Sequence, residues 1–347
     1  MTRSNHPILP PESQRGSAAI LFALFLTVVL GCAALAVDLT RLHLVKVELQ
    51  NAADAAALAG AQSLYDSEPY PDWVSARATA LEIAHRNFAN AARIQDASIE
   101  TGYWNLDTPS LGFRTTGLPV GGDVPAVRVT ISISTTANNG PVKFFFAPFL
   151  GIDESDMQAS AIAMRSAAGG GKGFFPWAIS NCAIQEFWDY ENNRPKVDEN
   201  GDPLAIDLSI ESVYHDDCIS GTWTTFWDED NSVPQVRHLI DHGNPLTMNI
   251  GDSTWIQAGV KDALFKYDGI KIGEPVPVLI VASADNLSIE VNTYQTILAI
   301  AALTIDEIVK INGKSHIIGH LSEHMDSDLD PGTGPYVGSL SRAVLIR

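Results

Sequence analysis

The segment that decides the fold is residues 17–64, which reads SAAILFALFLTVVLGCAALAVDLTRLHLVKVELQNAADAAALAGAQSL. Its first 21 residues, 17–37, carry no charge and are long enough to cross the hydrocarbon core of a bilayer as a helix. Residues 38–64 contain no proline and no glycine before Gly60, and they are rich in alanine and leucine. We therefore predict a transmembrane helix at 17–37 that continues unbroken into a stalk helix at 38–64, roughly 72 Å in all.

Two other interpretations of this segment remain open. Arg3 and Arg15 followed by an apolar run and the A-x-A sequence at 34–36 could mark a cleaved signal peptide, and residues 29–32 (VLGC) could mark a lipoprotein. However, the apolar run is longer than the usual signal core of about 7–15 residues, and a helical pattern continues after Ala36. We therefore favour a retained anchor.

Length and composition indicate what lies beyond the anchor. A chain of 347 residues is long enough for two modest globular units after the anchor. Its content of 46% hydrophobic and 18% charged residues is typical of globular protein. The net charge is −19, and because residues 1–37 carry a net +1, the remainder carries −20. Such an acidic surface repels nucleic acid and anionic lipid headgroups, so we expect no nucleic-acid partner and no binding of the soluble part to a membrane surface.

The orientation of the anchor follows weakly from charge. Arg3 and Arg15 precede the span while Arg41 and Lys46 follow it, so the count of basic residues is nearly equal on the two sides. The bulky acidic remainder favours a cytoplasmic N-terminus and an exported C-terminal region, periplasmic or at the cell surface.

The cysteines support export. Cys182 and Cys218 lie far out in the soluble part, whereas Cys32 lies inside the apolar run. Two cysteines in an exported domain predict one disulfide, Cys182–Cys218, and the alternative is two unrelated buried thiols.

Apolar residues of the stalk helix recur with alternating spacings of three and four. They form a stripe of large residues that gives way to small ones: Leu42, Val45, Leu49, Ala52, Ala56 and Ala59. Because small residues let another backbone approach closely, this stalk face is expected to pack against partner helices or against the protein's own sheet. We favour the second over a self-associating coiled coil.

The same region is similar to a known family. The residues that carry the resemblance are Arg15-Gly16-Ser17, Ala36-Val37-Asp38, Arg41-Leu42 and above all the run LQNAADAAALAGA at 49–61. They resemble the N-terminal domain of the TadE/TadG-like proteins of the Flp (tight-adherence) pilus-assembly system. The resemblance implies a bacterial inner-membrane protein with its N-terminus in the cytoplasm. It also implies inner-membrane lipid and pilin-like or pilus-assembly membrane proteins as partners.

Two features of related systems are missing from the sequence. A type IV prepilin is cut after a glycine and carries Glu at the fifth mature position, but a cut after Gly16 would place Leu21 there. The D-x-S-x-S metal site of larger adherence proteins is absent too, because residues 153–157 read DESDM. Prepilin processing and a metal-dependent adherence domain are therefore not carried over.

The pattern beyond the stalk predicts an α+β fold. A second helix is expected after Pro71, and then the period changes to two, most clearly in Val127–Ile133. Many short apolar runs follow the glycine cluster at 169–173 and indicate a mostly β region, in which Thr296–Thr304 fits a buried strand as well as a helix. We predict six segments: a cytoplasmic segment 1–16, the span 17–37, the stalk 38–64, a pilin-like α+β domain with a small antiparallel sheet 65–168, a Gly-rich linker 169–173 and a β-rich exported domain 174–347.

Few residues point to chemistry. His316, His320 and His324 share one face of a predicted strand, but His316 and His324 would lie too far apart for one ion. The acidic loop 326–332 (DSDLDPG) resembles the start of a calcium loop but has Pro331 in place of the glycine, so turn chemistry is favoured. We predict no catalytic residues, no metal site and no cofactor.

The predicted function is a membrane-anchored structural component of Flp/Tad-type pilus assembly or adherence that acts by protein–protein interaction and is not an enzyme. The alternative is an exported cell-surface or periplasmic binding module, calcium-stabilised through an acidic loop and unrelated to pili.

Overall fold

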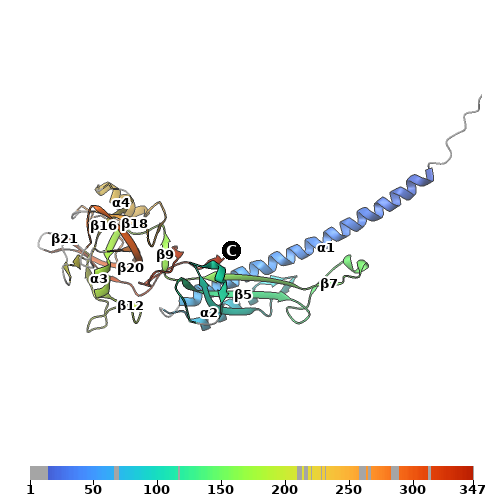
Figure 1. The fold of residues 1–347 in the computed structure, drawn as a ribbon, viewed down its shortest axis with the longest axis horizontal. Coiled ribbons are helices and arrows are strands. Elements are labelled where there is room, and N and C mark those ends of the chain that lie inside the picture. The colour runs from blue at the N-terminus through green and yellow to red at the C-terminus, as the bar shows by residue number, and fades with distance from the viewer. Residues whose placement is uncertain are drawn as a thin grey trace, which may run out of the picture.

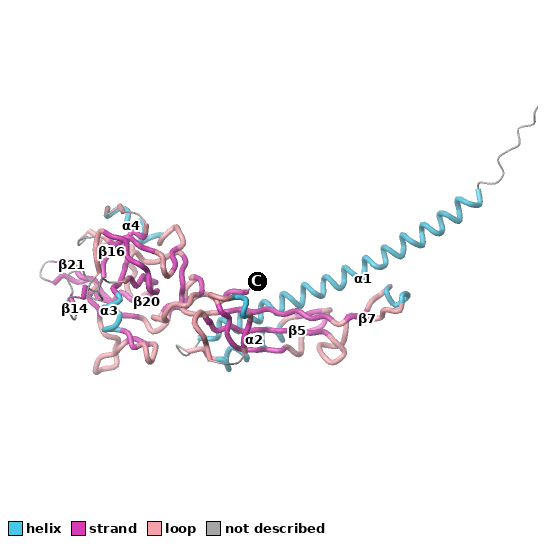
Figure 2. Tube along the Cα trace, viewed as in Figure 1, coloured by secondary structure: helices cyan, strands magenta, loops and turns pink. Residues whose placement is uncertain are grey.

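The computed structural model describes residues 15–65, 70–115, 118–208, 213–214, 218–219, 221–227, 229–230, 232–257, 263–264, 267–282, 289–311 and 314–346. All but the last two residues of the predicted cytoplasmic segment 1–16 lie outside these ranges. A long helix leads into an α+β domain that packs around the helix's C-terminal half, and a second, β-rich domain lies at the far end (Figure 1). Figure 2 shows strands in both domains, with α2 in the α+β domain and α3 and α4 in the β-rich domain.

Helix α1 runs from Arg15 to Gln62 without a break and is followed by the 3₁₀ turn η1 (Ser63–Tyr65). It holds a stretch apolar and long enough to cross a membrane, and the most apolar window of that stretch has no buried residue. From Asp38 onward, one side of the same helix is buried in the α+β domain. The prediction of an apolar N-terminal helix that continues into a stalk is confirmed.

Helix α2 (Trp73–Arg86) packs against the end of α1. It begins after Asp72, whose carboxylate accepts the backbone N–H groups of Val74 and Ser75 and so satisfies two donors that the first turn leaves free. Small side chains face α1 at intervals of four residues: Ala76, Ala80 and Ala84. A Cβ atom at Gly60 of α1 would lie 2.9 Å from the carbonyl oxygen of Ala76, so the two helices meet closely there.

The sheet of the α+β domain has five strands in the order β25-β8-β5-β3-β4, all antiparallel. Alternate residues of β5 from Val127 to Ile133 are buried, in line with the predicted period-two strand. The outer strand β25 comes from the C-terminal region and pairs with β8, Val344 opposite Met164. The strands are β3 (Ser98–Asn105), β4 (Phe113–Arg114), β5 (Asp123–Ile133), β8 (Met157–Met164) and β25 (Val344–Ile346).

Short elements complete this domain. It contains two short antiparallel ribbons, each made of two-residue strands, and two 3₁₀ turns in its loops. They are β1 (Phe88–Ala89) with β2 (Ala92–Arg93), β6 (Val142–Lys143) with β7 (Glu154–Ser155), η2 (Pro109–Leu111) and η3 (Ala147–Leu150).

The β-rich domain contains a seven-stranded sheet in the order β13-β21-β20-β18-β16-β10-β19. Because β19 also pairs with β20, five of these strands close into a ring. The segment Thr296–Thr304 lies inside β20, a 19-residue strand, so the strand alternative holds there. The strands are β10 (Trp177–Ser180), β13 (Ile206–Asp207), β16 (Gly221–Phe226), β18 (Ser253–Ile256), β19 (Pro275–Val281), β20 (Thr293–Ile311) and β21 (Lys314–Leu321).

Two short helices and several small ribbons surround this ring. They are α3 (Asn181–Phe187), α4 (Val233–His242), β9 (Ala168–Gly171), β11 (Trp188–Asp189), β12 (Arg194–Pro195), β14 (Val213–Tyr214), β15 (Cys218–Ile219), β17 (Met248–Asn249), β22 (Met325–Asp326), β23 (Asp330–Pro331) and β24 (Ser339–Leu340).

The glycines between the two domains are packed. Strand β9 (Ala168–Gly171) pairs with β17 and β23, and a Cβ atom at Gly169 would lie 2.4 Å from the Cα atom of Gly332. Glycine is needed there for close backbone approach. The division of the chain into six segments stays a prediction, to which the structure adds that residues 344–346 complete the sheet of the first domain.

Candidate functional site

The predicted stalk face lies against the protein's own α+β domain. Val45, Leu49, Ala52 and Ala56 are buried, and they join one hydrophobic core with residues of β5 and β8. Leu42 and Ala59 are half-buried at the two ends of the stripe. In this structure the six residues therefore serve the packing of the helix on its own sheet.

The opposite side of the stalk is free. Leu44 and Val47 are 57% and 41% exposed, and Leu39 is exposed beside the end of the apolar run. Exposed apolar residues on a helix that emerges from a membrane provide a surface to which another helix can bind. This side, rather than the predicted stripe, is the one available to a partner.

Asp38 lies where the apolar run ends, and it holds a loop of the α+β domain against α1. Its carboxylate accepts the backbone N–H groups of Phe145, Phe146 and Ala147 at 2.8, 2.9 and 2.7 Å. Burial acts to raise the pKa of Asp38, but these three donors and the charge of Arg41 outweigh it and lower the pKa below its usual value. The signal for its role is a single carboxylate that ends an uncharged run.

Arg165 joins the two domains. Its side chain is only 1% exposed, and its Nε atom donates to the carbonyl oxygen of Ser341 at 3.0 Å. One terminal nitrogen donates to the carbonyl oxygen of Gln62, the last residue of α1, and the other pairs with Asp326 of the β-rich domain. A cation at the C-terminal end of a helix is favoured by the helix dipole. Sequence analysis missed this residue.

The predicted disulfide is confirmed. Cys182 of α3 and Cys218 of β15 are bonded, and both are buried in the main core of the β-rich domain. The same core contains Trp177 and Trp223, whose rings meet edge to face at 4.7 Å. The crosslink therefore fixes a peripheral helix onto the β-rich core. The third cysteine, Cys32, is exposed on α1.

The three histidines and the acidic loop considered in the sequence analysis form separate polar pairs and do not gather at one site. His316, His320 and His324 lie 2.8–3.0 Å from three different carboxylates, those of Asp207, Asp306 and Asp326. Asp326 also pairs with Arg165, and Asp330 of the same acidic loop pairs with Arg342. Within the described ranges, no three His, Cys, Asp or Glu side chains are grouped so that they could hold a metal ion.

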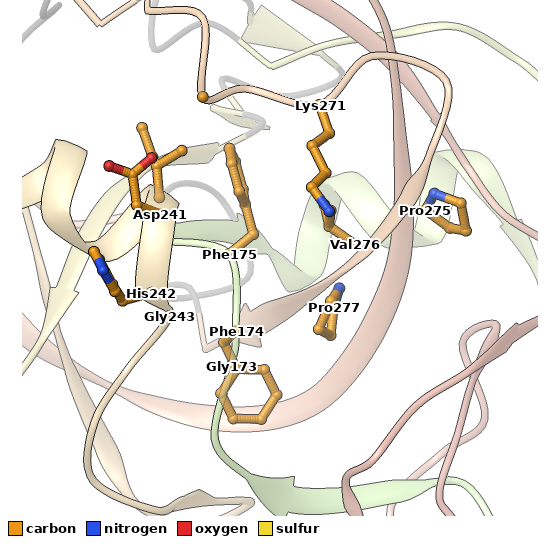
Figure 3. Close-up of a pocket in the computed structure, with 12 residues that line it drawn as sticks. Gly173, Phe174, Phe175, Asp241, His242, Gly243, Lys271, Pro275, Val276 and Pro277 are labelled. Atoms are coloured by element: carbon orange, nitrogen blue, oxygen red, sulfur yellow. The ribbon is translucent and has the colours of Figure 1, made fainter.

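A cleft of about 370 Å³ opens on the β-rich domain between α4 and the loop before β19. In Figure 3, Asp241 and Lys271 lie on either side of Phe175, and Pro275 and Pro277 complete the wall. The hydroxyl of Tyr267 donates a hydrogen bond to Asp241. This mixture of two phenylalanine rings and two opposite charges can bind a small group or a peptide side chain, and the residues that line it include no nucleophile paired with a base.

Comparison with known families accounts for the first half of the chain. Residues 16–63 match a family described as Flp pilus-assembly TadE/G-like, and residues 59–163 match one described as Tad-like Flp pilus-assembly. No curated protein and no solved structure matches the chain. The matched residues cover α1 except Arg15, all of α2, and all strands of the first sheet except β25 and the last residue of β8. The apolar helix and these domains together fit a single-pass membrane protein. Residues 16–163 therefore carry the TadE/G-like and Tad-like Flp pilus-assembly domains, which supports the resemblance found in the sequence.

Proposed function

We propose that the protein is a structural component of Flp-type pilus assembly or adherence that acts through protein–protein contacts rather than catalysis. The observation that carries this proposal is the division of α1. One continuous helix has no buried residue in its most apolar window and contributes to the core of the α+β domain over its C-terminal part. A domain built on its own membrane helix is held at a fixed height above the bilayer, which suits a scaffold for membrane subunits.

We further propose a bacterial inner-membrane location, with the N-terminus in the cytoplasm and both domains in the periplasm or at the cell surface. The Cys182–Cys218 disulfide supports this orientation because disulfides form and persist in oxidising compartments.

The partners in this proposal are pilin-like or other pilus-assembly membrane proteins, together with inner-membrane lipid. The free side of the stalk, which carries Leu44 and Val47, extends the exposed apolar surface of the span into water. A partner helix lying along α1 would cover both regions at once.

The test is co-purification of pilin-like subunits with the tagged full-length protein from detergent-solubilised membranes of a strain that lacks the native copy. The wild-type protein should retain pilin-like subunits and restore piliation. Val47→Asp should lose both, because it places a charge in the proposed contact. Leu246→Asp, at an exposed leucine of the β-rich domain, is the matched control and should lose neither. Normal piliation without the protein would contradict the proposal.

A second function is favoured by one observation: residues 164–347, which include the β-rich domain and its cleft, lie beyond the matched families. This domain would then be an exported binding module, calcium-stabilised or not, unrelated to pili. A deletion strain with normal pili but lost binding to a surface ligand would identify it.

A further inference from the structure

The loop between β6 and β7 carries an unusual apolar surface, which we call the aromatic finger (Phe144–Ile152). Its sequence, FFFAPFLGI, has no charged or hydrogen-bonding side chain in nine residues. Phe149 is 88% exposed and Leu150 is 67% exposed, and Phe145 and Ile152 are more than half exposed. Soluble surfaces rarely gather so many large apolar side chains in one place, so this patch indicates an apolar surrounding.

The finger lies beside the apolar run of α1, which indicates that its apolar surrounding is the lipid bilayer. An apolar cleft of about 410 Å³ separates Phe146, Phe149 and Leu150 from α1, where its wall runs from Val28 to Leu35. These α1 residues belong to the uncharged run 17–37. At 1.5 Å per residue, Val28 lies roughly 14 Å along the helix from Val37, which is about half of a hydrocarbon core of ~30 Å. If α1 crosses the bilayer over 17–37, the tip of the finger lies at the depth of the acyl chains.

The backbone N–H groups of the finger have hydrogen-bond partners within the protein, as a hydrocarbon surrounding requires. In hydrocarbon, every backbone polar group needs a partner within the protein. The N–H groups of Phe145, Phe146 and Ala147 are taken by Asp38, and Pro148 has none. Four further backbone N–H groups of the finger donate to nearby carbonyl oxygens: Phe144 to Asp153, Phe149 to Phe146, Gly151 to Pro148 and Ile152 to Ala147.

Charged groups flank the base of the finger. Arg41 of α1 stacks over the ring of Phe145, with its guanidinium carbon 4.6 Å from the ring centre. Lys143 is exposed and directly precedes the finger, and Asp153 directly follows it. Basic and aromatic residues in this arrangement are typical of the level of lipid headgroups.

We propose that the aromatic finger inserts into the leaflet from which α1 emerges, so that lipid acyl chains fill the cleft between them. The protein then has two membrane contacts: a spanning helix and a non-spanning finger joined to it through Asp38. A single helix leaves the domain free to tilt and rotate, whereas a second contact beside it fixes the face that the α+β domain presents to neighbouring subunits.

The depth of the finger can be measured on the full-length protein in lipid nanodiscs. A nitroxide is attached to Phe149→Cys in a Cys32→Ala background, and its accessibility to oxygen, which concentrates in lipid, is compared with that to a water-soluble nickel chelate. The oxygen-to-nickel ratio at 149 should be several-fold above the ratio at Val197→Cys, an exposed apolar position of the β-rich domain. A label at Phe22→Cys reports the span itself.

The outcomes separate the finger from the anchor. High ratios at both 22 and 149 support the proposal. A high ratio at 22 with a ratio at 149 as low as at 197 overturns it and leaves the spanning helix intact. A photo-crosslinking phenylalanine analogue at 149 in cells distinguishes the occupant: lipid adducts support the proposal, whereas adducts to another protein or a second copy overturn it.

Discussion

The guanidinium of Arg165 donates a hydrogen bond to the main-chain carbonyl of Gln62, the last residue of α1, and the same side chain pairs with Asp326 of the β-rich domain. One buried cation therefore connects the end of the membrane helix to the distal domain. Since Arg165 directly follows β8, it also lies where the chain leaves the first sheet.

Arg165→Met is expected to lower the free energy of unfolding by about 2–3 kcal/mol, because it removes charge-assisted hydrogen bonds and leaves buried carbonyls without donors. The measurement is thermal unfolding of the full-length protein in detergent, followed by tryptophan fluorescence. Arg342→Met is the control, since its pair with Asp330 is more than half exposed on both sides and should contribute about 0–1 kcal/mol. Equal effects of the two variants would contradict the role of Arg165.

Gly60→Ala tests the contact between α1 and α2. Alanine improves helix propensity by about 1 kcal/mol, but its Cβ atom would lie 2.9 Å from both the Ala76 carbonyl oxygen and the Ala80 Cβ atom. Overpacking of this kind costs about 1–3 kcal/mol, so we expect a net loss of thermal stability. Gly31→Ala is the matched control, because nothing beyond the backbone of its own helix lies within 4 Å of its Cβ position. A gain in stability at position 60 would show that the helices can move apart.

Reduction of the Cys182–Cys218 disulfide should destabilise the β-rich domain. The bond closes a loop with a sequence separation of 36, for which the chain-entropy relation gives about 4 kcal/mol. Dithiothreitol, or the double substitution to serine, should therefore lower the unfolding temperature of this domain more than that of the α+β domain. Cys32→Ser should leave both transitions unchanged. Limited proteolysis with and without the reductant tells the two domains apart.

Asp72 makes the start of α2 sensitive to acid. Hydrogen bonds from the backbone and hydroxyl of Ser75 and from the backbone of Val74 lower the pKa of Asp72 below its usual 3.8. Its ionised form therefore stabilises the fold fully above that value, and this contribution is lost as the pH falls through the lowered pKa. Thermal unfolding of Asp72→Asn between pH 6 and about pH 2.5 should show a smaller loss than the wild type. Asp156→Asn, at an exposed aspartate, should follow the wild-type curve.

Much of the first half of the fold could be predicted because its signals are local. An uncharged run followed by an alanine-rich stretch specifies α1, and the alternation in Val127–Ile133 specifies β5, since each pattern repeats over many residues. The disulfide followed from the two cysteines beyond the anchor. The ambiguity at Thr296–Thr304 was settled by tertiary pairing, because β20 has strands on both sides.

The features that could not be predicted depend on contacts between residues that are far apart in the sequence. Strand β25 has only three residues, too few to show a period, and its partner β8 lies in the other half of the chain. The burial of Arg165 depends on Ser341 and Asp326, which lie 176 and 161 residues away in the sequence. Asp38 gave a weak signal as the carboxylate that ends the apolar run, but the loop it holds lies more than a hundred residues away.

The pairing of β8 with β25 has a mechanical meaning. The chain leaves the first sheet at Met164 and returns at Val344, two residues that face each other across neighbouring strands. The β-rich domain lies beyond this end of the sheet, roughly along the direction of its strands (Figure 1). A pull on that domain is therefore shared by two covalent tethers and loads β8 in shear along its whole contact with β5, instead of peeling away one strand at a time.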